Sequence, residues 1–230
     1  MLILEGLRLA QDEFALEADI VFPDQAITAL IGPSGAGKST LLSAIAGFLA
    51  PAQGRIMWDG NDLSGIPPGR RPFSMLFQDN NLFPHLTVLQ NVGLGLRPDL
   101  RLTVDEKKQC QDALAQVGLA GLDGRKPGAL SGGQQSRVAL ARVLVADRPL
   151  VMLDEPFAAL GPALKDEMLD LVKAQLLAAD KTVLMVTHDP SDARRVADHA
   201  VLVADGVVCD PVPTDVLLDN PPPALADYLG

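Results

Sequence analysis

The chain has 230 residues, of which 48% are hydrophobic and 21% are charged, and its formal net charge at pH 7 is −10. A chain of this length forms one large domain or two small ones, and this apolar fraction is enough to build a buried core. The acidic balance argues against a nucleic-acid partner, because phosphate contacts need a basic face.

The sequence shows no recognisable targeting segment. No apolar run approaches the roughly 18–20 residues that a membrane-spanning helix needs, and the first residues lack the basic region and apolar block of a secretory signal. Cys110 and Cys209 form no disulfide framework, so both are expected to be reduced thiols. We therefore expect a cytoplasmic protein that can still dock onto a membrane protein.

The first part of the chain predicts strands around one helix. Apolar and polar residues alternate from Phe14 to Phe22, which is typical of a strand, and a helix is expected over residues 41–46. The turn Asp59-Gly60 ends another short apolar run. The expected strands cover residues 14–22, 26–31, 55–58 and 74–77.

The middle of the chain has a helical character. Thr103 and Glu106 fit a capping box, in which two side chains satisfy the free N–H groups at the start of a helix. That helix is expected to run to Val117 and to stop at Gly118. Residues 79–145 are therefore expected to be mainly helical.

Strands and helices alternate again toward the end of the chain. Pro162 suits the first turn of a helix, and Asp205-Gly206 is a hairpin signal. The proline-rich residues 221–223 are expected to form an exposed ending. The expected strands cover residues 150–153, 182–186, 201–203 and 207–209. This order predicts an α/β core with a helical insertion.

Residues 32–39 match the phosphate-loop pattern G-x-x-x-x-G-K-[ST]. Glycines let the backbone turn with positive φ and approach phosphates closely, and the positive end of the following helix attracts anions. Lys38 supplies a mobile cation, and the Ser39 hydroxyl can ligate Mg²⁺. We expect ATP to contact Gly32, Pro33, Ser34, Gly35, Ala36, Gly37, Lys38, Ser39 and Thr40.

Two adjacent carboxylates, Asp154 and Glu155, follow an apolar strand at its carboxyl end, where ligands bind in open α/β sheets. We expect Asp154 to face a magnesium ion and Glu155 to act as a general base near the attacking water. Taken alone, the pair is also compatible with a solvated strand end.

A second glycine-containing segment precedes a helix expected at residues 135–146. It consists of Ser131, Gly132, Gly133 and Gln134, and follows Leu130. Such a segment can be a second anion-binding helix start. Taken alone, it is equally compatible with Ser131 serving only as a helix cap.

These three motifs, in this order, resemble those of the nucleotide-binding subunits of ABC transporters, whose signature is Leu-Ser-Gly-Gly-Gln. The resemblance covers nearly the whole chain. It implies an α/β fold, the P-loop NTPase ABC cassette, with a RecA-like core, an antiparallel β subdomain and a helical subdomain. It also implies a single domain over residues 1–230, with the core and β subdomain in 1–78 and 146–230 and the helical subdomain in 79–145.

The resemblance further implies a homodimer, in which ATP lies between the phosphate loop of one copy and residues 131–134 of the other. Gln78 is similar to the family's glutamine that reaches magnesium and the attacking water, and His188 to its histidine that contacts the γ-phosphate. The implied catalytic residues are Glu155, His188 and Gln78, and the implied ligands of Mg²⁺ are Ser39, Gln78 and Asp154.

Two positions depart from the family pattern. Gly161 stands where the family usually has an aspartate that couples the two sites, which leaves that coupling open, although glycine can still cap the helix before Pro162. Gln11 lies near the place of the aromatic residue that stacks on adenine, and the nearest aromatic residue, Phe14, is expected to pack in the core. Arg137 is expected to be a structural or interface charge.

Residues 71–83, 85–88 and 91–96 are similar to the ATP-binding subunits of bacterial thiamine importers. This resemblance implies uptake of thiamine or its phosphates, with a membrane permease and, indirectly, a periplasmic solute-binding protein as partners. It places the chain at the cytoplasmic face of the inner membrane. A short helix of the permease is expected to dock near Phe77, Leu82 and Phe83, unless these residues pack in the core.

Other transported solutes stay open as alternatives. Importer subunits for iron, molybdate or polyamines often carry an additional C-terminal domain, for which this chain is expected to be too short. An importer of one of these solutes or of sulfate is the alternative function. A soluble ABC ATPase that acts outside transport is a more distant one.

Overall fold

The structure is a computed structural model that describes residues 1–11, 14–158 and 160–229. One half of its sheet is parallel, and three of the strands there, at the centre, are buried at every position, as expected for strands that are covered on both faces. The strands of this half are β3 (Ile27–Ile31), β6 (Phe73–Leu76), β7 (Leu150–Asp154), β8 (Thr182–Val186) and β9 (His199–Ala204).

The other half of the sheet is mainly antiparallel. Its strands are β1 (Leu2–Gln11), β2 (Phe14–Val21), β4 (Gln53–Trp58), β5 (Asn61–Asp62) and β10 (Val207–Val208). Strand β10 joins the halves, because it pairs antiparallel with β9 and parallel with β2. The strand order is β5-β4-β1-β2-β10-β9-β3-β8-β7-β6, with β11 (Val212–Pro213) beside β9.

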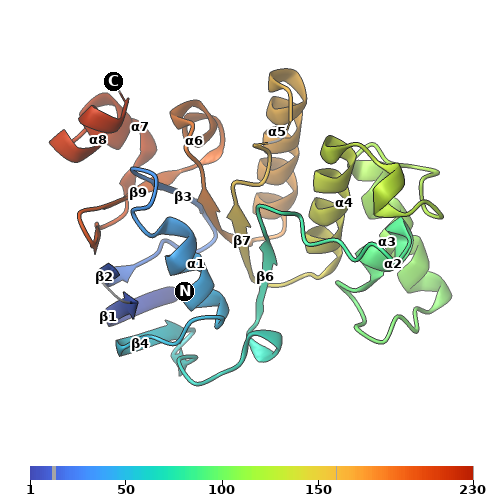
Figure 1. Ribbon diagram of the computed structural model, residues 1–230, viewed down its shortest axis with the longest axis horizontal. Helices are drawn as coiled ribbons and strands as arrows, with labels where there is room; N and C mark the ends of the chain where they lie inside the picture. Colours follow the sequence, from blue (N-terminus) through green and yellow to red (C-terminus); the bar gives the residue numbers. More distant parts are fainter. Residues whose placement is uncertain (12–13, 159, 230) are drawn as a thin grey trace.

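Helices cover the sheet and extend it at one side. Figure 1 shows α2, α3 and α4 together beyond β6 and β7, away from α1 and the antiparallel strands. Within the described ranges, no helix has both the length and the apolar character that crossing a membrane requires. The helices are α1 (Lys38–Ala46), α2 (Val88–Gly93), α3 (Val104–Gln116), α4 (Gly132–Val145), α5 (Pro162–Ala178), α6 (Pro190–Val196), α7 (Thr214–Asp219) and α8 (Pro223–Leu229), with short 3-10 turns at Pro68–Arg70 and Pro127–Ala129.

Successive residues of the parallel strands face two separate hydrophobic clusters. Leu30 of β3 and Leu184 of β8 belong to a cluster with α1 and the antiparallel strands. Ile31 and Val183 belong to a second cluster, which contains residues of α2 to α6. Helix α1 is therefore fixed by apolar packing, and the loop that precedes it is fixed with it.

The carboxyl end of α1 is held by a buried arginine. Arg71 is only 3% exposed, and its guanidinium donates hydrogen bonds to the carbonyl oxygens of Ala44 and Ile45 at 3.0 and 2.6 Å and of Ile66 at 2.8 Å. The last carbonyls of a helix have no partner within the helix. Arg71 satisfies them and so anchors α1 to the segment that leads into β6.

Most of the expected elements are confirmed. The strands expected around residues 14–22, 26–31, 55–58, 74–77, 150–153 and 182–186 are present, as is the hairpin at Asp205-Gly206. Thr103 and Glu106 make both hydrogen bonds of a capping box at the start of α3, which ends before Gly118 with its φ of 70°. The two cysteines are free thiols.

Three features differ from the sequence prediction. Strand β1 is present although the sequence pattern does not predict it. Its register shifts between Leu4 and Leu7, so the buried positions change from even to odd residue numbers and the apolar residues do not alternate regularly. Helix α4 begins at Gly132 rather than at residue 135. The proline-rich residues 221–223 are half-buried or exposed, but they do not form an irregular ending, because they lead into α8, where Leu225 is fully buried.

Candidate active site

The loop between β3 and α1 can be built only with glycine at two positions. Gly32 and Gly37 have φ angles of 146° and 100°. A Cβ atom on Gly32 would lie 2.1 Å from the carbonyl oxygen of Val203, and one on Gly37 would lie 2.5 Å from the Phe14 ring. The first turn of α1 contains no acidic residue. Its N–H groups and positive end are therefore available to an anion such as a phosphate.

Lys38 lies inside this loop. Its ammonium group donates to the carbonyl oxygens of Gly32 and Pro33, both at 2.8 Å, and the side chain is largely buried. Burial lowers the pKa of Lys38, while the nearby carboxylates of Glu155 and Asp154 oppose that shift. The loop thus carries its own cation, held in reach of any phosphate that the loop binds.

Ser39 and Asp154 meet at the base of the loop. The Ser39 hydroxyl donates to Oδ1 of Asp154 at 2.9 Å, and Asp154 is 7% exposed. Burial raises the pKa of Asp154, and the neighbouring Glu155 raises it further, whereas the hydrogen bond from Ser39 lowers it. A hydroxyl and a carboxylate side by side are the hard oxygen ligands that Mg²⁺ prefers, so this pair fits a magnesium ion.

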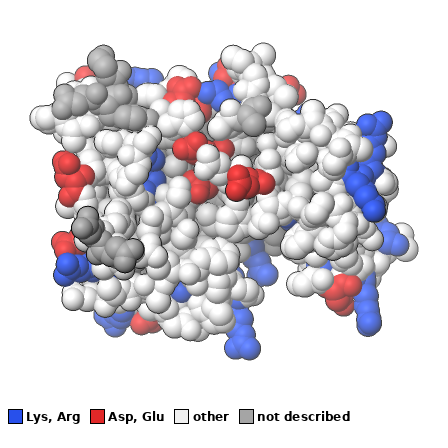
Figure 2. All heavy atoms as spheres, in the orientation of Figure 1, with Lys and Arg blue, Asp and Glu red and all other residues white. Residues whose placement is uncertain are grey.

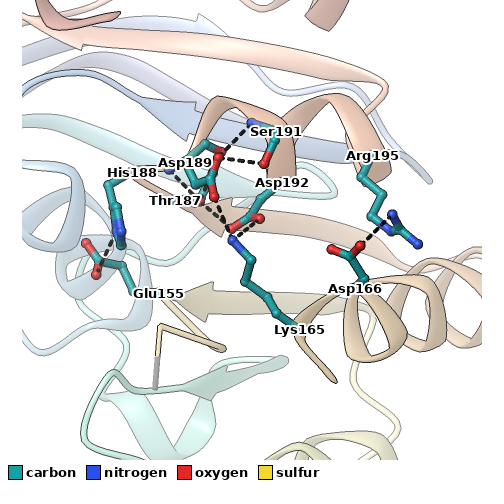
Figure 3. A network of polar contacts seen from close by, with 9 residues as sticks. All are labelled: Glu155, Lys165, Asp166, Thr187, His188, Asp189, Ser191, Asp192 and Arg195. Carbon is teal, nitrogen blue, oxygen red and sulfur yellow. Dashed lines mark hydrogen bonds and ion pairs between the residues drawn. The ribbon is translucent and has the colours of Figure 1, made fainter. Parts of the chain in front are cut away.

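Glu155 turns out of β7 toward His188. Its backbone is left-handed, with a φ of 45°, and its N–H donates to the carbonyl oxygen of Val186 at 3.1 Å. Figure 3 shows the two side chains facing each other, and Oε2 of Glu155 lies 3.2 Å from Nδ1 of His188. A left-handed glutamate is strained, and such strain is common where a side chain is aimed for function.

The surroundings of this pair are acidic. A cavity of about 280 Å³ lies beside Glu155 and His188 and is also lined by Asp189 and Asp192. Figure 2 shows acidic side chains gathered near the middle of this face, with many of the lysines and arginines toward its edges. An anionic ligand therefore depends on Lys38, the loop N–H groups and a metal cation to offset local repulsion.

Gln78 lies two residues after β6, next to β7 in the sheet, and is exposed. The residues that follow, Asn80 and Asn81, both have left-handed backbones. Arg142 of α4 donates to both of their carbonyl oxygens, at 2.8 and 2.9 Å. No local pattern distinguishes Arg142, since only the folded chain places it against this loop.

The segment Ser131–Gln134 forms a complete capping box at the start of α4. The Ser131 hydroxyl accepts from the N–H of Gln134 at 3.3 Å, and the Gln134 side chain accepts from the N–H of Ser131 at 3.0 Å. Figure 1 shows α4 on the far side of β6 and β7 from α1. Within one chain, the two helix starts are therefore not adjacent.

Aromatic residues near the site have mixed roles. Phe14 packs against the hydrophobic cluster around α1, as expected, and its ring covers Gly37. Phe77 contacts Phe48 with ring centroids 5.7 Å apart, and Phe83 is 43% exposed. Leu82 packs against the core. Phe48, which the sequence did not single out, is 59% exposed and widens this apolar surface.

The structure explains two further residues from the sequence. Arg137 donates to the carbonyl oxygen of Val117 at 3.0 Å, which confirms a structural role. Gly161 directly precedes α5, and a Cβ atom there would meet no other atom within 4 Å. A side chain at position 161 is therefore sterically allowed. The neighbouring Ala159 of the same loop lies outside the described residues.

Comparison with known proteins identifies the class. A sequence model described as "ABC transporter" matches residues 17–158. A solved dimeric ATP-binding cassette, in a post-hydrolysis state with ADP and Pi, superposes with a TM-score of 0.82 at 29% identity over 93% of this chain and 99% of that one. A nucleotide-free cassette from an ABC transporter superposes with a TM-score of 0.86 at 25% identity, over 100% of this chain and 99% of that one. The chain belongs to the ABC transporter family, and its fold is that of the family's ATPase cassette.

Two curated relatives are similar over their whole length. The thiamine import ATP-binding protein ThiQ of Ruegeria sp. (strain TM1040) is 57% identical, over 100% of both chains. The protein of the same name from Cereibacter sphaeroides is 58% identical, again over 100% of both chains.

Proposed function

We propose that this chain is the ATP-hydrolysing subunit of an importer for thiamine or its phosphates. The observation that supports this most is the full-length identity of 57–58% to proteins named as thiamine import ATP-binding proteins. This full-length similarity includes residues 71–96, the region that contains the segments similar to thiamine importer subunits.

Binding of the nucleotide is assigned to the loop 32–40. Its inward N–H groups and the start of α1 hold the phosphates, and Lys38 offsets their charge. Ser39, Asp154 and Gln78 would hold Mg²⁺, which would offset the negative charge of the nucleotide phosphates. The hydrogen bond between Ser39 and Asp154 at 2.9 Å supports this assignment, because it places the two side chains together.

Hydrolysis is assigned to Glu155, Gln78 and His188. Glu155 accepts a proton from the attacking water, and Gln78 orients that water. His188, 3.2 Å from Glu155, contacts the γ-phosphate and fixes the glutamate.

The site is completed by a second copy of the chain. Ser131, Gly132, Gly133 and Gln134 start a helix far from the phosphate loop of their own chain, so we assign them to the ATP of the partner copy. A dimeric ATP-binding cassette among the similar structures supports this arrangement. The transport partners are a permease, which docks on the surface around Phe77 and Phe83, and a periplasmic solute-binding protein. The chain then works at the cytoplasmic face of the inner membrane.

The solute is tested with the assembled transporter. The chain is purified with its membrane subunits, reconstituted, and assayed for ATPase with binding proteins for thiamine, iron, molybdate, sulfate and polyamines. Thiamine or a thiamine phosphate is expected to stimulate hydrolysis. Stimulation by another solute alone would contradict the thiamine assignment while leaving the ATPase assignment intact.

A further inference from the structure

The residues on both sides of His188 are tied to one another. Thr187 is 4% exposed, and its hydroxyl donates to Oδ2 of Asp192 at 3.1 Å. The same hydroxyl accepts from the N–H of Asp189 at 3.1 Å. Asp189 in turn accepts from the N–H and hydroxyl of Ser191 at 2.9 and 2.6 Å. The loop that carries His188 is therefore ordered as a unit with the first turn of α6.

One side chain ties this unit to a different element. The ammonium of Lys165, in the first half of α5, lies 2.6 Å from Oδ2 of Asp189 and 2.6 Å from Oδ1 of Asp192 (Figure 3). Helix α5 begins just after the loop that starts at Glu155. Lys165 therefore connects the loop after β7 with the loop after β8.

A cavity lined by apolar as well as charged side chains separates parts of these two loops. The cavity of about 280 Å³ that borders Glu155 and His188 is also lined by Lys165, Asp189 and Asp192. The starts of the two loops are held together by the backbone hydrogen bond from the N–H of Glu155 to the carbonyl oxygen of Val186. Farther along the loop after β8, the ionic contacts of Lys165 join that loop to α5, so they contribute to the placement of His188 relative to Glu155.

We propose that Lys165 is a positioning residue that holds His188 against Glu155 by anchoring Asp189 and Asp192 to α5. This inference rests on the role proposed above for His188. Lys165 itself does not contact the nucleotide in this arrangement, and it acts through the loop that it anchors.

The charges in this cluster are paired under neutral conditions. The hydrogen bond from Lys165, followed by those from Ser191, lowers the pKa of Asp189 to about 2. Burial lowers the pKa of Lys165, but its hydrogen bonds to Asp189 and Asp192 outweigh burial and leave the pKa raised. Lys165 and Asp189 are thus both ionised at neutral pH, and their contact is constant rather than switched by pH.

The chain offers a matched control on the same two helices. Arg195 of α6 contacts Asp166 and Asp170 of α5 at 3.2 and 2.7 Å. It also joins α5 to α6, but Figure 3 shows it pointing away from His188. Arg195 is 38% exposed, whereas Lys165 is 19% exposed. Exposed pairs of this kind contribute little to stability.

The test compares Lys165→Met, Lys165→Arg and Arg195→Gln in the transporter assembled with its membrane subunits. Lys165→Met is expected to lower kcat for ATP on the order of tenfold, with KM for ATP changed less than about twofold, because binding is separate from positioning. Lys165→Arg is expected to recover most of the rate, and Arg195→Gln to retain it. Asp192→Asn, which keeps the volume and the partner of Thr187, serves as a second variant if Lys165→Met does not fold, and is expected to lower kcat similarly.

A spectroscopic measurement separates positioning from loss of stability. The chain has three histidines, His85, His188 and His199, so a His188→Ala variant assigns the imidazole resonance of His188 in NMR spectra of the full chain. Lys165→Met or Asp192→Asn should shift that resonance, and Arg195→Gln should not. Equal rates in all variants, or an unmoved His188 resonance, would overturn the inference. If His188→Ala itself hydrolyses ATP normally, the proposed role of His188 fails instead.

Discussion

At the scale of single residues, the site contains ionisable groups whose charged forms are destabilised by burial. A bound nucleotide and its cation would offset that cost. Asp154 is 7% exposed, has a raised pKa because of burial, and stands directly before Glu155. Lys38 is held by carbonyl oxygens rather than by a close carboxylate. Both groups are more costly to ionise here than in water. This is the arrangement expected of groups that meet a phosphate and a metal cation.

A first prediction concerns Asp154 and stability. A raised carboxyl pKa means that ionising Asp154 destabilises the folded chain, an effect that is absent below its ordinary pKa of 3.8 and grows as the pH rises above that value. Asp154→Asn should therefore raise the melting temperature of the nucleotide-free chain at pH 7 by a few degrees and should abolish hydrolysis. Calorimetry at pH 7 and near pH 4 checks this. A lower melting temperature at pH 7, or an equal gain at both pH values, would contradict the account.

A second prediction concerns Gly161. The family usually has aspartate at this position, and a Cβ atom here meets no neighbour within 4 Å. Aspartate can also cap a helix start before Pro162. Gly161→Asp is expected to fold normally and to raise ATPase turnover or its cooperativity in the assembled transporter. Steady-state kinetics over a range of ATP concentrations measures both quantities, and identical kinetics would count against a coupling role for this position.

At the scale of elements, patterns that involve only neighbouring residues predicted the structure correctly. The capping box at Thr103 predicted the start of α3, because that geometry involves only neighbouring residues. Strand β1 was not predicted, since a bulge near Gly6 changes which side chains face the core. Helix α8 could not be predicted, because its stability depends on the packing of Leu225 in the hydrophobic cluster that contains residues of α2 to α6. The contacts of Lys165, Arg142 and Arg71 could not be predicted either, because most of their partners lie far away in the sequence.

Two of the capping boxes allow a third prediction. Ser131 starts α4 and Thr103 starts α3 with the same pair of hydrogen bonds. Replacing either residue with alanine should destabilise the chain by about 1 kcal/mol, the usual cost of a lost cap. Only Ser131→Ala should also lower ATPase, because its hydroxyl is assigned to the partner's nucleotide. Denaturant unfolding and ATPase assays compare the two, and equal loss of activity in Thr103→Ala would contradict the assignment.

At the scale of the whole molecule, the sheet order explains why distant residues meet. Strands β3, β8, β7 and β6 are neighbours and parallel, so their carboxyl ends bring the phosphate loop, His188, Glu155 and Gln78 to one edge. The sequence predicted this edge because each motif follows an apolar strand. It could not predict the 3.2 Å contact of Glu155 with His188, which depends on the left-handed turn at Glu155.

In the proposed dimer, each chain supplies half of two ATP sites, and Glu155 is the general base for hydrolysis. Glu155→Gln keeps the shape of the side chain and removes the base, so ATP should bind without being consumed and should hold two copies together. Light scattering of this variant, after size-exclusion chromatography with saturating ATP and Mg²⁺, measures its mass directly. We expect a species of twice the 24.3 kDa chain mass with ATP and a single chain without ATP. A mass of 24.3 kDa in both conditions, or hydrolysis at the wild-type rate, would contradict the claim.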